Sequence, residues 1–230
     1  MGQLDSANLL QILSETRLVA IIRGDTPQSA VAAARVLFDA GVRLVEIALT
    51  TPGALDAIAE LAPGLPEGSY LGAGTVLTED DVDAVAAAGA HFVVTPAVTE
   101  SVAYAVDRGL PVLAGAFTPT EVREAWRAGA AAVKVFPASA VGPGYFKAVH
   151  DPFPDIPLLA VGGVGLAQLP EYLAAGAVGL GVGGPLVGDA ARGGDLEALA
   201  ERARAFVAAA ARGAGARAES ETQASSEAGR

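Results

Sequence analysis

The sequence predicts a closed (β/α)8 barrel. The first observation is a phrase that recurs along the chain: a helix ends in glycine and runs directly into a β-rich segment, as in "DAGVRLVEIAL", "AAGAHFVVTP" and "RAGAAAVKVFP". The second is its spacing, because Gly89, Gly109 and Gly129 lie 20 residues apart, which leaves room for one helix, one buried strand and two short loops. The third is length, since 230 residues suit a single α/β barrel domain.

Eight apolar runs are the predicted strands, each followed by a helical pattern. The strands are expected at 17–23, 43–49, 70–73, 91–95, 111–114, 131–136, 157–161 and 178–182. The helices are expected at 27–40, 52–62, 79–88, 100–108, 119–128, 142–149, 167–175 and 195–211. Strands that alternate with helices form parallel sheets with helical crossovers. Eight units at this length favour a closed barrel over an open sheet.

The ends of the elements and of the chain carry signals of their own. Thr78, Thr99 and Thr118 precede acidic first turns and are predicted N-caps. The amphipathic stretch 6–15 is expected to be an extra helix that plugs the bottom of the barrel. Residues 212–230 contain no large apolar residue and are expected to be disordered. The predicted domain is therefore 1–211, followed by a C-terminal tail.

Composition and charge exclude several classes of function. The net charge of −11 argues against a nucleic-acid or membrane-surface partner, although not against a small anionic substrate. No apolar run reaches 18 residues and no secretory signal is evident, so a cytoplasmic location is expected. The absence of cysteine excludes disulfides and thiolate chemistry. His91 and His150 have no ligand companions, so neither a metal nor another cofactor is predicted.

One of only two lysines in the chain lies within an apolar run, "AAVKVFP". Lysine is depleted in strands and is almost never buried without a reason. A desolvated ammonium loses proton affinity, and a neutral amine is the nucleophile that forms a Schiff base. Lys134 is therefore the candidate catalytic amine, while Lys147 is expected on the surface.

A carboxylate interrupts a second such run, "LVEIAL", at Glu46. Glu46 and Lys134 lie on even-numbered strands, whose inward side chains can share a layer, so Glu46 is the candidate acid/base. Two plainer interpretations stay open. Lys134 could extend its charge to solvent at a strand end, or it could form a structural salt bridge with Glu46.

The C-terminal ends of the strands form the functional face of such barrels. The residues predicted there from strands one to six are Arg23, Glu46, Thr75, Pro96, Lys134 and Phe136. Strands seven and eight run into "VGGVG" and "GVGGP", which contain Gly162, Gly163, Gly183 and Gly184. Backbone N–H groups in these loops bind phosphate in many barrels, and glycine allows close approach. The alternative is that these glycines only make tight turns.

These segments resemble a known family. "VAIIRGDTP", "VEIALTTP", "LGAGTVL", "VVTPAVTE", "VKVFPASAVGPGYFKAV" and "AGAVGLGVGG" occur in family order over residues 17–187. The chain resembles the bacterial 2-keto-3-deoxy-6-phosphogluconate (KDPG) and 2-keto-3-deoxy-6-phosphogalactonate (KDPGal) aldolases, which are class I pyruvate aldolases. The resemblance implies a carbon–carbon lyase that cleaves such a substrate to pyruvate and glyceraldehyde 3-phosphate, and it implies a homotrimer.

The resemblance also implies a role for each site residue. Lys134 matches the Schiff-base lysine and Glu46 the general acid/base. Arg23 and Thr75 match positions near the pyruvyl carboxylate, and Pro96 and Phe136 match apolar walls. The four glycines fall where the family holds phosphate; they are Gly162, Gly163, Gly183 and Gly184.

Three positions depart from the gluconate-type pattern. Thr50 stands where many members have arginine, Val161 where many have threonine, and Gly184 where a serine is frequent. Val161 is more like the galactonate-type members, so the preferred C4 epimer stays open. Rival functions are a 4-hydroxy-2-oxoglutarate aldolase, a non-covalent phosphosugar isomerase or epimerase that uses Glu46 as base, and a non-catalytic phosphosugar sensor.

Overall fold

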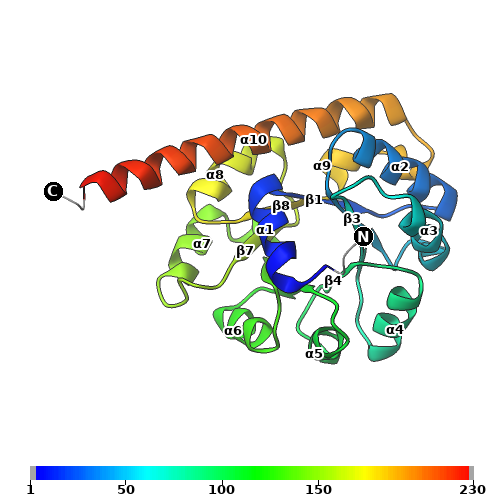
Figure 1. Ribbon diagram of the computed structural model, residues 1–230, viewed down its shortest axis with the longest axis horizontal. Helices are drawn as coiled ribbons and strands as arrows, with labels where there is room; N and C mark the ends of the chain where they lie inside the picture. The colour runs from blue at the N-terminus through cyan, green and yellow to red at the C-terminus, as the bar shows by residue number, and fades with distance from the viewer. Residues whose placement is uncertain (1–3, 228–230) are drawn as a thin grey trace.

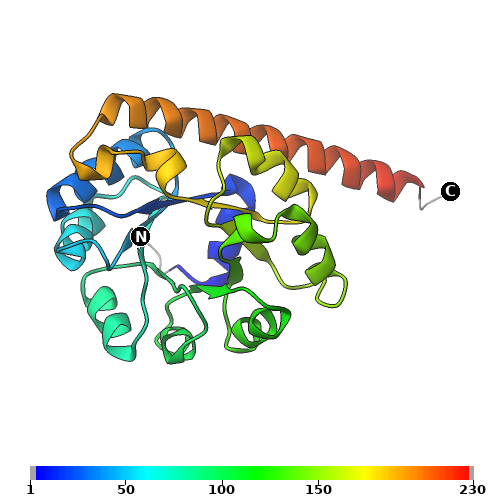
Figure 2. The same ribbon diagram turned by 180° about the vertical axis from the view of Figure 1, so that it is seen from behind.

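A computed structural model describes the backbone of residues 4–227 and the side chains of residues 4–212. Eight parallel strands close into one barrel in the order β1 to β8, which confirms the predicted fold class. The strands are β1 (Leu18–Ile22), β2 (Leu44–Ala48), β3 (Tyr70–Gly74), β4 (Phe92–Val94), β5 (Val112–Ala116), β6 (Ala132–Val135), β7 (Leu158–Val161) and β8 (Gly179–Val182). The helices form a ring around them (Figures 1 and 2).

Each strand is followed by a helix at nearly the predicted position. These helices are α2 (Pro27–Asp39), α3 (Ala54–Leu61), α4 (Glu79–Ala87), α5 (Glu100–Asp107), α6 (Pro119–Arg127), α7 (Pro143–His150), α8 (Leu169–Ala174) and α10 (Leu196–Glu227). The glycines at the helix ends have the expected left-handed backbone, with φ of 94° at Gly89, 75° at Gly109 and 91° at Gly129. A short helix that was not predicted, α9 (Gly184–Val187), follows β8.

Successive strand residues face opposite sides of the barrel wall. Val133 and Val135 of β6 pack outward in the core between strands and helices, so Lys134 faces the barrel interior. Likewise Val45 and Ile47 of β2 pack outward, and Glu46 faces inward. The two charged residues therefore enter the same interior space.

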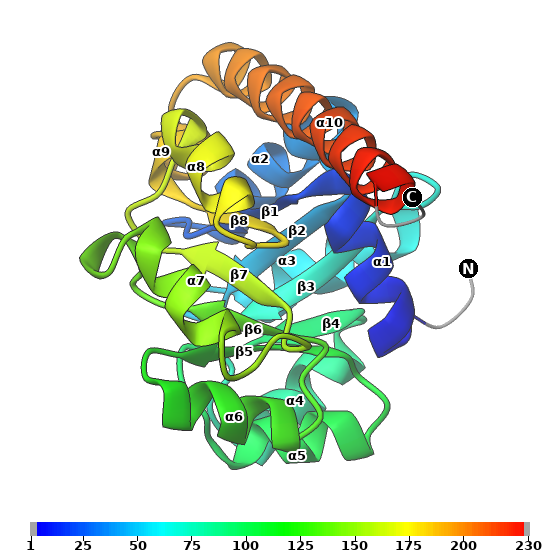
Figure 3. The same ribbon diagram turned by 90° about the vertical axis from the view of Figure 1, so that its left-hand side faces the viewer.

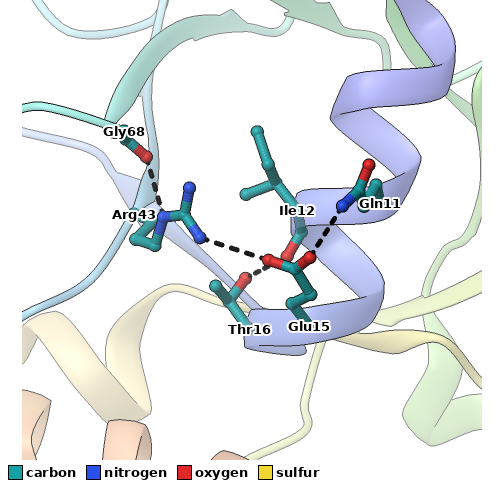
Figure 4. Close-up of polar contacts among 6 residues, drawn as sticks. All are labelled: Gln11, Ile12, Glu15, Thr16, Arg43 and Gly68. Carbon is teal, nitrogen blue, oxygen red and sulfur yellow. Dashed lines mark hydrogen bonds and ion pairs between the residues drawn. The ribbon is translucent and has the colours of Figure 1, made fainter.

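Helix α1 (Ser6–Thr16) lies across the N-terminal end of the barrel (Figure 3). Its Leu9 and Leu13 are fully buried and belong to one apolar cluster with Val19 and Leu44 from the interior. Arg43 attaches the helix to the wall, because its side chain donates to Gly68 O at 2.8 Å and pairs with Glu15 at 3.3 Å (Figure 4).

Two of the three predicted N-caps are confirmed and one is wrong. Thr78 and Thr118 cap their helices through capping boxes. Thr99 stands at the N-cap of α5 but makes no capping bond. Its hydroxyl lies 2.7 Å from Ser101 Oγ instead.

Helix α10 continues to Glu227, and its end projects past the barrel (Figures 1 and 2). The predicted helix stops near 211, and 212–230 was expected to lack structure. Alanine, arginine and glutamate are good helix formers and can extend a helix without apolar residues. Residues 228–230 lie outside the described part. Among the described residues, no helix is both long and apolar enough to cross a membrane.

Candidate active site

Lys134 and Glu46 are buried together inside the barrel, with 5% and 2% of their surface exposed. The ion pairs among the described residues lie elsewhere, and Lys134 and Glu46 form no direct one. Glu46 Oε2 is buried without a hydrogen-bond partner among the described residues. The salt-bridge interpretation therefore fails, and both groups remain available for chemistry.

Burial moves both groups toward their neutral forms. It lowers the pKa of Lys134, while the Glu46 charge raises that pKa and the Arg23 charge lowers it. Burial also raises the pKa of Glu46, and the charges of Lys134 and Arg23 act against this rise. An amine of lowered pKa beside a carboxyl of raised pKa is an arrangement found at catalytic sites.

Space for Glu46 comes from strand β3. Gly72 is the register partner of Glu46, and Gly74 faces the same interior. A Cβ at Gly74 would lie 2.5 Å from Glu46 Oε1. The carboxylate is therefore seated directly against the bare backbone of β3.

A pocket of about 150 Å³ opens above Lys134 at the C-terminal face. The predicted site residues that line it are Arg23, Lys134, Phe136, Val161, Gly162, Gly163, Gly183 and Gly184. Phe136 lies with its ring centroid 5.3 Å from Lys134 Nζ. The structure therefore brings eight of the predicted residues into one cavity.

The glycine loops form one wall of this pocket. Gly162 and Gly163 have φ of 92° and 69°, a conformation that side chains rarely adopt. A Cβ at Gly162 would also lie 2.9 Å from the Phe136 ring. Gly184 differs, since nothing lies within 4 Å of a Cβ placed there. Glycine is thus required by the backbone at the first two positions but not at Gly184.

Three predicted residues do not line this pocket: Glu46, Thr75 and Pro96. The charge of Glu46 nevertheless acts on Lys134, whose pKa it raises. Thr75 follows Gly74 directly and has φ of 62°, which is unusual for a β-branched residue. Pro96 follows β4, and its carbonyl group lies against Gly115 of β5.

Sequence reasoning did not assign roles to three threonines. Thr50 Oγ1 accepts a hydrogen bond from Arg23 Nη1 at 3.2 Å. Thr51, which is buried, accepts from Gly24 N at 3.0 Å and joins the loops after β1 and β2. Thr95 is fully buried after β4. The only sequence signal is a polar residue within three residues of a strand end, and it does not identify the hydrogen-bond partner.

The described residues contain no group of three or more His, Cys, Asp or Glu side chains that could hold a metal ion. The expected absence of a metal or other cofactor stays a prediction.

Comparisons with known proteins agree with this geometry. The family model described as "KDPG and KHG aldolase" matches residues 9–201. The chain is 40% identical over 200 residues to a 2-dehydro-3-deoxy-6-phosphogalactonate aldolase of Escherichia coli, covering 86% of this chain and 96% of that protein. It is 38% identical over 171 residues to a 2-dehydro-3-deoxy-phosphogluconate aldolase of Pseudomonas aeruginosa, covering 74% and 77%.

A solved structure adds the chemistry of a relative. The KDPG aldolase of Legionella pneumophila, with pyruvate captured as a covalent carbinolamine, superposes with a TM-score of 0.80 at 26% identity. The match covers 89% of this chain and 99% of that one.

Proposed function

Because the chain belongs to the KDPG and KHG aldolase family, we propose that Lys134 carries out a class I aldol cleavage in this barrel. The protein is an aldolase, a carbon–carbon lyase. The proposed reaction converts KDPG or its galactonate epimer to pyruvate and glyceraldehyde 3-phosphate. The observation that carries the proposal is the buried amine of Lys134, which faces the pocket without a direct ion pair.

The chemistry follows from the environment of the amine. Burial lowers the pKa of Lys134, so more of it is the neutral nucleophile. The amine attacks the C2 carbonyl, and loss of water from the carbinolamine leaves an iminium. Glu46 accepts the proton of the C4 hydroxyl, the C3–C4 bond breaks, and its electron pair moves to the iminium nitrogen. The aldehyde leaves, the enamine takes up a proton at C3, and hydrolysis releases pyruvate and the free amine.

The raised pKa of Glu46 supports its place in these steps. A carboxyl that burial moves toward neutral pH can both give and accept a proton there. Its unpaired Oε2 offers an acceptor within the barrel interior.

The substrate is proposed to span the pocket from Arg23 to the glycine loops. Arg23 and Thr75 are assigned to the carboxylate, and Pro96 and Phe136 to the apolar walls. The backbone N–H groups beside the glycines are assigned to the phosphate, because Gly162 and Gly163 line the pocket without side chains. Fixing the phosphate would orient the reacting carbons.

Val161 is the proposed epimer-discriminating position. It lines the pocket and is nearly fully buried, and valine offers neither donor nor acceptor to a hydroxyl. A site without a polar partner discriminates weakly between epimers. We therefore propose that both forms are cleaved, with less than about a hundredfold difference.

A homotrimer and a cytoplasmic location are also proposed. Several large apolar residues on helices and connections are 38–40% exposed: Leu55, Leu77, Phe117 and Trp126. Such exposed apolar surface is compatible with subunit contacts. Sedimentation equilibrium tests the trimer, which a monomeric mass would contradict.

The two lysines provide a matched test of the proposal. Lys134→Arg keeps a positive charge but cannot form an iminium, because guanidinium stays protonated. Lys147→Arg makes the same change on the exposed face of α7. We expect Lys134→Arg to abolish cleavage and Lys147→Arg to retain the wild-type rate. Substantial cleavage by a folded Lys134→Arg protein would contradict the assignment of Lys134 as the Schiff-base amine.

A further inference from the structure

The hydroxyl of Thr95 replaces a backbone group in the barrel wall. Strands β4 and β5 pair in parallel through Val93↔Val112 and Val94↔Leu113. Thr95 N continues this ladder by donating to Leu113 O at 3.1 Å. In a regular parallel ladder the next bond would run from Gly115 N to the carbonyl of Thr95. Gly115 N instead donates to Thr95 Oγ1 at 3.1 Å.

The same hydroxyl also fixes the residues that follow. Thr95 Oγ1 donates to Ala97 O at 2.7 Å. One fully buried hydroxyl therefore accepts from β5 and donates to the loop after β4. This use of a side chain in place of the backbone releases the chain from the ladder and turns it at Pro96.

The turned chain lies on the inner face of Gly115. A Cβ at Gly115 would collide with the carbonyl group of Pro96 and would lie 2.7 Å from Thr95 O. Ala114 and Ala116 pack outward, so the missing Gly115 side chain points into the barrel. The backbone of Pro96 thus occupies the interior position that a side chain at 115 would fill.

That position adjoins the reactive amine. Gly115 is the register partner of Lys134, and residues paired in this way present their side chains to the same face of a sheet. The Pro96 carbonyl group therefore lies beside the Lys134 side chain, on the β5 side of it.

We propose that Thr95 is a positioning residue for the aldol cleavage: its hydroxyl holds the Pro96 backbone over Gly115 as the wall beside Lys134. This inference rests on the proposed function of Lys134. A fixed wall excludes water from one side of the amine and limits where the bound keto acid can sit. A displacement of about 1 Å at such a wall can cost about a hundredfold in rate.

Thr95→Val is the direct test, because valine matches the shape of threonine but leaves Gly115 N and Ala97 O without their partner. We expect kcat/KM to fall about tenfold to a hundredfold, mainly through kcat. We also expect the rising limb of the kcat/KM profile to move to higher pH. Water that reaches Lys134 would relieve its desolvation and so raise its lowered pKa. Glu46 and Arg23, the charged groups that act on Lys134, are unchanged. Thr95→Ser retains the hydroxyl and should keep the rate within about threefold.

Thr16→Val is the matched control at the opposite end of the barrel. Thr16 Oγ1 donates to Ile12 O at 2.7 Å, and its loss should leave the rate and the pH profile unchanged (Figure 4). The rate of each variant is divided by the fraction of protein that forms a borohydride-reduced adduct with pyruvate, so that only folded active sites are counted. If Thr95→Val does not fold, Gly115→Ala takes its place, since it leaves the hydroxyl but pushes the Pro96 carbonyl away.

Three outcomes would overturn the inference. The first is wild-type kinetics in a folded Thr95→Val protein. The second is a lower rate without the pH shift, which a purely structural role would give. The third is failure of both the Thr95→Val and Gly115→Ala proteins to fold. Failure of the proposed function is separate, since it would appear as no pyruvate adduct in the wild-type protein.

Discussion

Thr75 offers a test that separates stability from activity. Its φ of 62° lies in the left-handed region, which costs a non-glycine residue about 1–2 kcal/mol. Glycine adopts this region freely, but its flexible unfolded state costs about 0.5–1 kcal/mol. Thr75→Gly should therefore raise the free energy of unfolding by about 0.5–1 kcal/mol, or the midpoint of thermal unfolding by about 1–4 °C.

Activity should move in the opposite direction. Thr75 is proposed to contact the substrate carboxylate, and a hydrogen bond to a charged group contributes about 1.5–3 kcal/mol. Its loss should lower kcat/KM by about tenfold to a hundredfold.

Urea unfolding gives the stability, and a coupled assay of pyruvate release gives kcat/KM. Thr120→Gly on α6 is the matched control. It should destabilise the protein, because glycine is a poor helix former, and it should leave the rate unchanged. A Thr75→Gly protein that is less stable than the wild type and equally active would refute both the strain and the assigned contact.

The remaining predictions concern the acid/base pair, the epimer and the tail. Glu46→Gln should slow cleavage by about 10²–10⁴-fold. It should also shift the rising limb of the pH–rate profile to lower pH, because the Glu46 charge raises the pKa of Lys134. Arg23→Gln should shift that limb to higher pH, since the Arg23 charge lowers the same pKa; limbs that do not move would contradict the electrostatic account. Val161→Thr should move the kcat/KM ratio toward the gluconate epimer, whereas an unchanged ratio would exclude Val161 as the discriminator. Removal of residues 212–230 should leave both kcat and the thermal midpoint unchanged; a lower midpoint would place the domain boundary farther along the chain.

The barrel could be predicted because its parallel strands are buried on both faces. They therefore read as short apolar runs, and the glycines before them mark the helix ends. The strand boundaries agree with the structure to within two residues. The end of α10 could not be predicted in this way, because no apolar residue marks how far the helix extends.

The candidate site was predictable where the sequence places a charge in an apolar run. Lys134 and Glu46 have this signal, but their separation without a direct contact depends on the closed barrel. The role of Thr95 was not predictable, because its partner Gly115 belongs to the neighbouring strand. The capping of Thr99 was mispredicted for a different, local reason, since the Ser101 hydroxyl two residues along the chain competes for the Thr99 side chain.

Covalent trapping of pyruvate tests the central claim most directly. The protein is incubated with pyruvate, reduced with borohydride and digested with trypsin, and the peptide masses are measured by mass spectrometry. A modified Lys134 resists cleavage, so the account predicts one peptide spanning 128–147 that carries a reduced pyruvyl group. Unmodified peptides 128–134 and 135–147, or an adduct on Lys147, would contradict the assignment of Lys134 as the Schiff-base lysine.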